Sequence, residues 1–323
     1  MKHERLTLTL LSALTLSSGC DSDNSQVPEA SGENDDSGLG LGADANEPRD
    51  RPELVGTFVV DMQSEREDAR AFGVLIGRVY DGPVPSAAPF EVAVETDGCQ
   101  LLVPAHPFCD PPCGGSGACT SENVCVRYPA SQDLGTLEVT GLGEPFSLKP
   151  STNAFVYQSA TLPFPPCAAG AAISIGADAL ALNGTCIAPL ELTTPDPIEV
   201  RIGRAVQLEW TAAKAGASRV QIALDISHHG GAKGRVVCDE PDIGSFEIPE
   251  PLVSQLISLG VAGFPDIKLA RVSRTAATRQ PRVTLEVSSS VQRVVDIGLT
   301  SCFTDDDCKE QSMRCDKARF VCE

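Results

Sequence analysis

Two adjacent histidines, His228 and His229, are the residues of this chain whose type and spacing come closest to a catalytic metal site. Asp225 lies three residues before His228 and could provide a third ligand. Imidazole and carboxylate groups bind zinc and related ions, and a metal-bound water can then drive hydrolysis. Neighbouring residues of a strand point to opposite faces, so the two imidazoles can share an ion only in the turn before Gly230-Gly231. The alternative, a solvated loop, is the interpretation that we favour.

No nucleophile motif accompanies these histidines. The chain has no Gly-x-Ser-x-Gly elbow, no His-Glu-x-x-His pair and no phosphate-binding loop. After residue 19 the chain has histidine at one further position, His106. This composition argues against an enzyme, and we predict neither catalytic residues nor a cofactor.

Asp305, Asp306 and Asp307 form a run of carboxylates that could bind calcium, because hard cations prefer clustered carboxylate oxygens. The alternative is the start of a helix. Thr304-x-x-Asp307 resembles a capping box, and acidic side chains stabilise the first turn of a helix. We favour the helix start and predict no metal site in the chain.

The predicted insert, residues 99–127, begins at Cys99 and has four further cysteines close together, at Cys109, Cys113, Cys119 and Cys125. The segment has little apolar content, so we expect it to fold through covalent bridges. Zinc binding is the competing interpretation, but zinc sites usually have two to four residues between paired thiolates. The two five-residue gaps do not fit that pattern. We therefore expect the disulfides Cys109–Cys119 and Cys113–Cys125.

The N-terminus indicates export. Lys2 and Arg5 precede an apolar run, Leu6–Leu16, which would span about 16 Å as a helix and is too short for a bilayer. Small residues and Cys20 follow, which resembles a bacterial lipoprotein cleavage site, although Ser17 stands where leucine is usual. The resemblance implies a signal peptide over residues 1–19 and a lipid attached to Cys20. Cleavage by the ordinary signal peptidase is the alternative.

The net charge is strongly negative. Lys plus Arg total 25 and Asp plus Glu total 44, for a formal charge of −19. Because nucleic-acid affinity depends on basic side chains that displace counterions from phosphates, we predict no nucleic-acid partner. An exported chain with 13 cysteines also indicates an oxidising compartment.

Residues 20–52 are expected to form a disordered acidic tether. The stretch to residue 50 has no aromatic residue and one basic residue, Arg49, against nine acidic ones. Such a composition buries too little apolar surface to offset the entropy of ordering. A flexible chain of this length has a mean reach of about 30 Å, so it would hold the folded part clear of the membrane.

The rest of the chain is predicted to be mostly β, as two β-sandwich-like domains with a disulfide-rich insert and a disulfide-rich tail. In the first domain, residues 53–192, Phe90, Val92 and Val94 alternate with other residues in a period of two. Further short strands are expected at Gly73–Tyr80 and Gly135–Thr140. Asn183-Gly184 predicts a type I′ hairpin turn.

The second domain is expected over residues 193–300. Val206, Leu208 and Trp210 share one face of a strand, and a second alternating strand follows at Val220–Ile226. These roughly 30 residues resemble strands B and C of a fibronectin type III or immunoglobulin-like sandwich. A short helix should begin at Pro251 and bury a leucine stripe before Gly260.

The tail, residues 301–323, has four cysteines whose spacing nearly repeats that of the insert. We expect it to pair Cys302 with Cys315 and Cys308 with Cys322, which would connect a helical start to the segment after it.

Two cysteines then remain uncertain. If Cys167 pairs with Cys186, Cys99 is left in the first domain and Cys238 in the second. Either one bridge joins the domains, or each keeps a free thiol. Cys238 follows Val236 by two places and should share its inward face, so we favour a buried, reduced Cys238.

Four-cysteine modules of this kind resemble those of cysteine-rich lipoproteins in myxobacteria, a class without an assigned activity. We expect a non-enzymatic, lipid-anchored protein of the bacterial cell envelope, at the outer membrane or cell surface rather than the inner membrane. It would serve in binding, adhesion or structure, with an unknown protein or glycan as its partner. The lipid would attach it to the membrane. The alternatives are a protease-inhibitor-like module that presents the insert, and a metal-dependent hydrolase that uses His228, His229 and Asp225.

Overall fold

The computed structural model describes residues 53–323, apart from 66–69, 87–89, 97, 178–179, 214–217, 228–232, 261–263, 279, 281, 301 and 319. The described chain is mostly β, as predicted, and also contains a short α-helix and a 3-10 helix. The predicted signal peptide, the tether and Cys20 lie outside the described residues. Among the described residues, no helix is both long enough and apolar enough to span a membrane.

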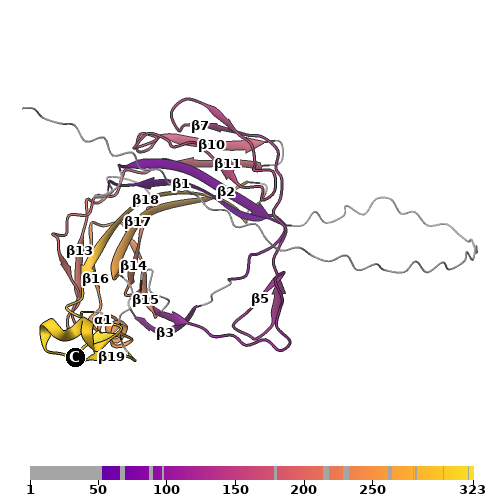
Figure 1. Cartoon of the computed structure of the whole chain (residues 1–323). Helices are drawn as coiled ribbons and strands as arrows, with labels where there is room; N and C mark the ends of the chain where they lie inside the picture. The colour runs from indigo at the N-terminus through magenta and orange to yellow at the C-terminus, as the bar shows by residue number, and fades with distance from the viewer. Residues whose placement is uncertain are drawn as a thin grey trace, which may run out of the picture. The chain divides into compact units, whose positions relative to one another are not determined.

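Ten strands of the described chain form one continuous sheet (Figure 1). Its neighbours pair antiparallel, except that β1 and β12 run parallel to β18. In spatial order the strands are β3 (Phe90–Thr96), β4 (Cys99–Pro104), β15 (Arg235–Pro241), β14 (Arg219–Asp225), β17 (Asp266–Ala276), β18 (Val283–Asp296), β1 (Val55–Gln63), β2 (Phe72–Tyr80) and β9 (Tyr157–Gln158), with β12 (Ile198–Glu199) beside β18.

Smaller elements cover this sheet or extend from it. The covering elements are β11 (Leu180–Thr185), β10 (Ala172–Ala177), β7 (Leu137–Thr140) and β8 (Phe146–Leu148) in one sheet, β13 (Val206–Glu209) and β16 (Ser245–Ile248) in another, and α1 (Glu250–Ser258). The insert contains β5 (Gly117–Cys119) and β6 (Cys125–Arg127), and the tail contains η1 (Asp305–Gln311), β19 (Cys315–Asp316) and β20 (Val321–Cys322).

Two hydrophobic cores lie along one face of the ten-stranded sheet. In β18, Leu285 and Val287 belong to the core beneath the four-stranded sheet. Val291 and Val295 of the same strand belong to the core beneath β13, β16 and α1. These residues are separated by even numbers of positions, so they point to the same face of the strand. One long strand therefore passes from the first core to the second.

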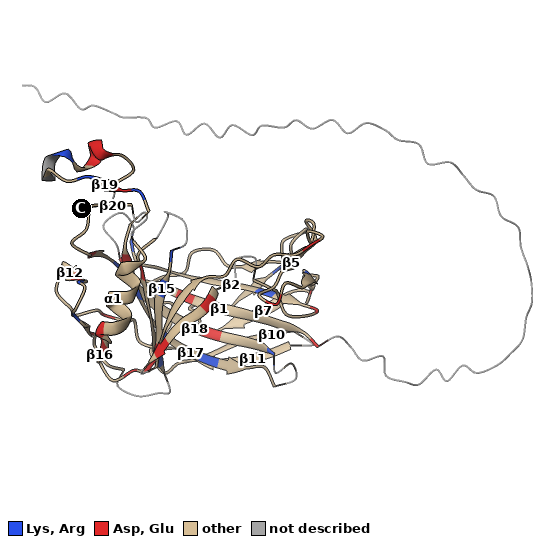
Figure 2. Ribbon diagram, turned by 90° about the horizontal axis from the view of Figure 1, so that it is seen from below, with Lys and Arg blue, Asp and Glu red and all other residues tan. Residues whose placement is uncertain are grey.

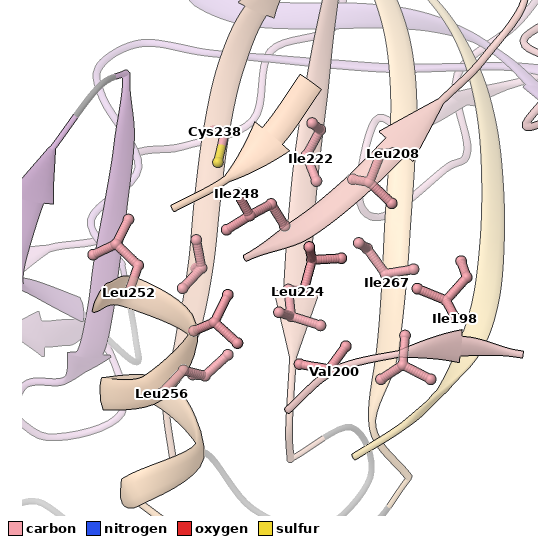
Figure 3. Packing of buried hydrophobic residues seen from close by; sticks show 14 of the residues in the cluster. Ile198, Val200, Leu208, Ile222, Leu224, Cys238, Ile248, Leu252, Leu256 and Ile267 are labelled. Carbon is pink, nitrogen blue, oxygen red and sulfur yellow. The ribbon is translucent and has the colours of Figure 1, made fainter. Parts of the chain in front are cut away.

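The second core shows how the covering layer is held. Leu252 and Leu256 of α1 point toward the side chains of β14 and β15 (Figure 3). Leu208 of β13 and Ile248 of β16 belong to the same cluster. All four side chains have no exposed surface. Burial of one such aliphatic side chain stabilises the fold by about 1.5–3 kcal/mol.

The predicted helix is confirmed. It spans Glu250–Ser258 with Pro251 in its first turn, and its buried residues include Leu252 and Leu256 of the predicted stripe. Gly260 follows with a φ of 82°, a left-handed conformation that glycine adopts without strain and that ends helices.

The predicted boundary at residues 192 and 193 does not separate two domains. β1 and β4, from the first predicted domain, pair with β18 and β15 of the second. Residues 50–323 accordingly form one compact unit. The physical reason is that a sheet of β15, β14, β17 and β18 alone would have two open edges with unpaired N–H and C=O groups, and the earlier strands cover both. Two sandwich-like layers are present, but they share one sheet.

The hairpin prediction at Asn183-Gly184 is wrong. Both residues lie inside β11, where Asn183 pairs with Ser174 and Gly184 with Ile173. A Cβ atom at Gly184 would lie 2.8 Å from Cδ2 of Leu285. Glycine here therefore provides room for a core side chain of β18 rather than a turn.

The predicted cysteine pairs are confirmed, with one correction. The insert and tail carry the expected bridges, and Cys167 pairs with Cys186. Cys238 is not reduced: it forms a disulfide with Cys99, and the two Cα atoms are 4.1 Å apart. Both side chains face the core, as predicted for Cys238. The prediction of a free thiol failed because β4 pairs directly with β15, which makes these two cysteines register partners.

Candidate binding surface

The face of the ten-stranded sheet opposite the two cores carries polar and small side chains. In β14, Ile222 and Leu224 point into the core, so Gln221 and Ala223 between them point the other way. The sheet is curved, and both covering layers lie on its convex side (Figure 1). We call the opposite side, formed by β4, β15, β14, β17 and β18, the concave face. Charged residues of both signs occur along its strands (Figure 2).

A depression of about 540 Å³ lies in the concave face. Its floor includes three small side chains, Ala223, Val237 and Ala270. Longer polar side chains surround them, among them Gln100, Gln221, Asp239, Lys268, Arg235, Glu95 and Glu286. The depression is therefore open and polar at its rim, with a small apolar floor.

Strand register explains this arrangement. Gln100, Val237, Ala223 and Lys268 are successive register partners across β4, β15, β14 and β17. Neighbouring strands lie about 4.8 Å apart, so this row of four spans about 14 Å. The row places an amide at one end, a cation at the other and small residues between them.

The acidic side chains of the rim already have partners. Glu286 accepts a hydrogen bond from Arg274 Nε at 2.6 Å, and Asp239 pairs with Arg219 at 2.8 Å. Glu95 accepts a hydrogen bond from Gln100 Nε2 at 3.2 Å. The two arginines compensate the charges of Glu286 and Asp239, whereas the neutral amide of Gln100 leaves Glu95 with its charge.

Two basic side chains of the depression are not compensated in this way. Neither Lys268 nor Arg235 has an ion pair within the described part of the chain. The Arg235 guanidinium stacks over the Phe90 ring, with its carbon 4.4 Å from the ring centroid. Arg235 Nε is buried and has no hydrogen-bond partner, which holds for no other buried side-chain nitrogen or oxygen among the described residues.

One carboxyl group near this depression has a raised pKa. Burial raises the pKa of Glu240, the nearby Arg219 lowers it, and the negative charge of Asp239 raises it further. β15 thus carries, at Glu240, a carboxyl group that is harder to ionise than an ordinary glutamate.

The predicted hydrolase residues are only partly described. One carboxylate oxygen of Asp225 accepts hydrogen bonds from the Ser227 N–H at 2.7 Å and from Ser227 Oγ at 2.9 Å, which closes the turn after β14. His228 and His229 lie outside the described residues. His106 is exposed and follows β4.

The acidic run of the tail is a helix start. Thr304 N–H and Phe303 N–H each donate to Asp307 Oδ2 at 2.8 Å, which holds the pKa of Asp307 below its ordinary value. Asp305 accepts a hydrogen bond from Cys315 N–H, and Asp306 pairs with Lys309. The three carboxylates thus serve separate partners, and the capping interpretation is confirmed.

The insert is an exposed, doubly bridged loop. Its cysteine sulfurs are joined in disulfides, so they are not the thiolates that zinc requires. The residues at its tip, Gly114-Gly115-Ser116, are exposed, and Phe108 at its base has 75% of its surface exposed.

No protein-family model matches the chain, and no curated protein matches it.

The sequence interpretation missed the residues of the depression. Period-two alternation around Ile267 and Leu269 indicates that Lys268 faces away from the core, and the same pattern applies to Arg235 beside Val236. That signal assigns a face to each residue. It does not reveal that these strands become neighbours on a concave surface, because strand pairing is set by contacts distant in sequence.

Proposed function

We propose that this protein is a non-enzymatic, exported binding protein of the bacterial cell envelope, anchored by a lipid on Cys20, and that its concave face binds a glycan. The observation that carries the proposal is the depression bounded by Gln100, Gln221 and the rim acids, on the face of the sheet that no described element of the core covers.

The chemistry of this face suits a ligand rich in hydroxyl groups. The backbone groups of β14 and β17 are engaged with strands on both sides, so recognition must come from side chains. Carboxylates accept hydrogen bonds and amides both donate and accept them. Sugar hydroxyls complement both kinds of group, and an open depression accommodates one or two units of a longer chain.

Cysteine use supports the anchor. The chain has 13 cysteines, and six disulfides use twelve of them. The thirteenth is Cys20, at the position where the lipoprotein-like signal implies lipid attachment. The disulfides also agree with folding in an oxidising, exported environment.

The strand arrangement supports the immunoglobulin-like resemblance of the second half. In such sandwiches strands C, F and G share one sheet, while B and E share the other. If β13 and β14 correspond to B and C, then β16 corresponds to E, and β17 and β18 to F and G. β14, β17 and β18 are neighbours in the large sheet, and β13 pairs with β16.

The protease-inhibitor alternative is favoured by one observation, the exposed loop between Cys109 and Cys125. Its tip offers Gly114, Gly115 and Ser116. A substrate-like inhibitor must fill a specificity pocket of the protease with a side chain, and this tip has almost none to offer. Inhibition of a panel of serine and cysteine proteases at stoichiometric protein would favour this alternative over glycan binding.

The test of the proposal is binding to an array of bacterial and plant polysaccharides, with two tryptophan variants. Ala223→Trp places a large ring in the floor of the depression, whereas Ala181→Trp places the same ring at an exposed position of β11. We expect the native protein to bind at least one saccharide, Ala223→Trp to abolish that binding, and Ala181→Trp to retain it. Absence of any saccharide binding, or equal binding by both variants, would overturn the proposal.

A further inference from the structure

We infer that the glycan bound in the depression is acidic, and that Lys268 and Arg235 together receive the carboxylate of one uronic acid unit. The inference rests on the proposed function and specifies its ligand class. It is drawn from which charges of the concave face are compensated within the protein and which are not.

Two acids of the rim, Glu286 and Asp239, are engaged in ion pairs with other arginines, so neither of them compensates Lys268 or Arg235. Glu286, Asp239 and Glu95 contact Arg274, Arg219 and Gln100 respectively. Two further acids lie on the same face, next to the cations. Asp225 receives both hydrogen bonds of Ser227, and Asp266 accepts one from Gln292.

Lys268 and Arg235 border the same part of the floor. Lys268 is the register partner of Ala223 on β17, and Arg235 lies on β15, on the other side of β14. Two strand spacings separate the strands that carry them, about 10 Å. The methyl group of Ala223 leaves the space between the two strands open, so an anion seated over β14 lies between the two cations.

The guanidinium of Arg235 is also held in a position from which it can donate hydrogen bonds to an oxygen acceptor. Its guanidinium is planar and is held against the Phe90 ring, which leaves its edge to donate hydrogen bonds. Its Nε is buried without a partner. A carboxylate that accepts from a guanidinium forms one of the stronger hydrogen bonds in proteins. Nε has almost no exposed surface, so a ligand carboxylate in the depression would accept from the terminal nitrogens of the guanidinium.

The overall charge restricts the ligand further. A chain with a net charge of −19 repels densely charged polymers, so nucleic acids and heavily sulfated chains are unsuitable. A sugar chain with isolated carboxylates brings one negative charge to the two cations, and its hydroxyl groups meet the amides and carboxylates of the rim.

The experiment compares an aldotetraouronic acid, a xylotriose that carries one glucuronic acid unit, with its methyl ester, which has the same hydroxyl groups and no charge. Affinities are measured by calorimetry for the native protein and for Lys268→Gln and Arg235→Gln. The matched controls are Lys149→Gln and Arg204→Gln, which remove the same charge at exposed positions outside the depression. Circular dichroism of each variant verifies that it is folded.

We expect the acid to bind roughly tenfold or more tightly than the ester, as for loss of a charged hydrogen bond. Each of the two depression variants should lose that preference, and the two controls should keep it. Equal binding of acid and ester would overturn the inference and leave glycan binding intact. Binding of a neutral saccharide from the array, without binding of either the aldotetraouronic acid or its methyl ester, would also overturn the inference and leave glycan binding intact. Competition by an acidic peptide alone would overturn the inference in favour of a protein ligand, and no saccharide binding at all would overturn the proposed function as well.

Discussion

Arg271 and Asp242 form a buried ion pair that joins β17 to the segment between β15 and β16. Nε of Arg271 lies 2.5 Å from Oδ2 of Asp242, and the two side chains have 1% and 3% of their surfaces exposed. Trp210 and Ser218 also donate to Asp242, each at 2.8 Å. The guanidinium of Arg271 further donates to backbone carbonyls, those of Ala188, Pro189 and Thr211. This network fixes the segment that leads from β11 to β12 against the long strand β17.

Loss of either partner should be strongly destabilising. Arg271→Met leaves a buried carboxylate without its cation, and Asp242→Asn leaves the guanidinium without its anion, so each should cost about 3–5 kcal/mol. The matched control is Arg274→Met, which removes an exposed partner of Glu286 and should cost less than about 1 kcal/mol. Urea unfolding measures all three. A cost for Arg271→Met as small as that for Arg274→Met would contradict the assigned role of the pair.

The same network predicts how stability depends on pH. Burial raises the pKa of Asp242, but hydrogen bonds from Arg271, Trp210 and Ser218 outweigh it and hold the pKa below its ordinary value. A carboxyl group with a depressed pKa in the folded state contributes stability above its unfolded pKa, and that contribution is lost as pH falls through the folded pKa. The free energy of unfolding should therefore decrease below about pH 4. The decrease should be smaller in Asp242→Asn. The same decrease below about pH 4 in the native protein and in Asp242→Asn would contradict this assignment.

The Cys99–Cys238 disulfide should contribute more to stability than the short-loop disulfides. It joins residues 139 apart in sequence, whereas Cys167 and Cys186 are 19 apart. Chain-entropy estimates give about 5 kcal/mol for loops above 100 residues and about 3 kcal/mol for short ones. In thermal unfolding, the double variant C99A/C238A should lower the Tm more than C167A/C186A does. Alkylation in denaturant without reductant checks the bridge independently, and labelling of Cys99 or Cys238 would contradict it.

Lipid attachment can be tested at Cys20. The native protein should partition into the detergent phase, and Cys20→Ala should appear in the aqueous phase or remain as the uncleaved precursor. Mass spectrometry of the mature N-terminus reports the lipid directly. Equal partitioning of both forms would exclude the anchor.

Local features of the fold could be predicted from sequence patterns. The leucine stripe of α1, the inward face of Val206 and Leu208, and the tail pairing all follow from spacing and alternation, which depend on neighbours in the chain. The same alternation places Cys238 on an inward face correctly. Each of these depends on residues that are at most 14 positions apart in the chain.

Pairing between distant strands could not be predicted in this way. Nothing near Cys99 indicates that β4 lies beside β15, and nothing near β1 indicates its parallel pairing with β18. The two-domain division failed for this reason, and so did the prediction for Cys238. Arg271 did carry a readable signal. It follows Ile267 and Leu269 in the inward alternation, and an arginine at an inward position indicates a buried partner.

Glycan binding on the concave face is tested most directly by methyl NMR of the protein labelled at alanine, titrated with the saccharide that binds best. The methyl groups of Ala223 and Ala270 lie in the depression, Ala181 lies on the exposed side of β11, and Ala118 lies in the insert. We predict saturable shifts of Ala223 and Ala270 with Ala181 and Ala118 unchanged. Shifts confined to Ala118, or no shift at Ala223 and Ala270 at saturation, would contradict the account.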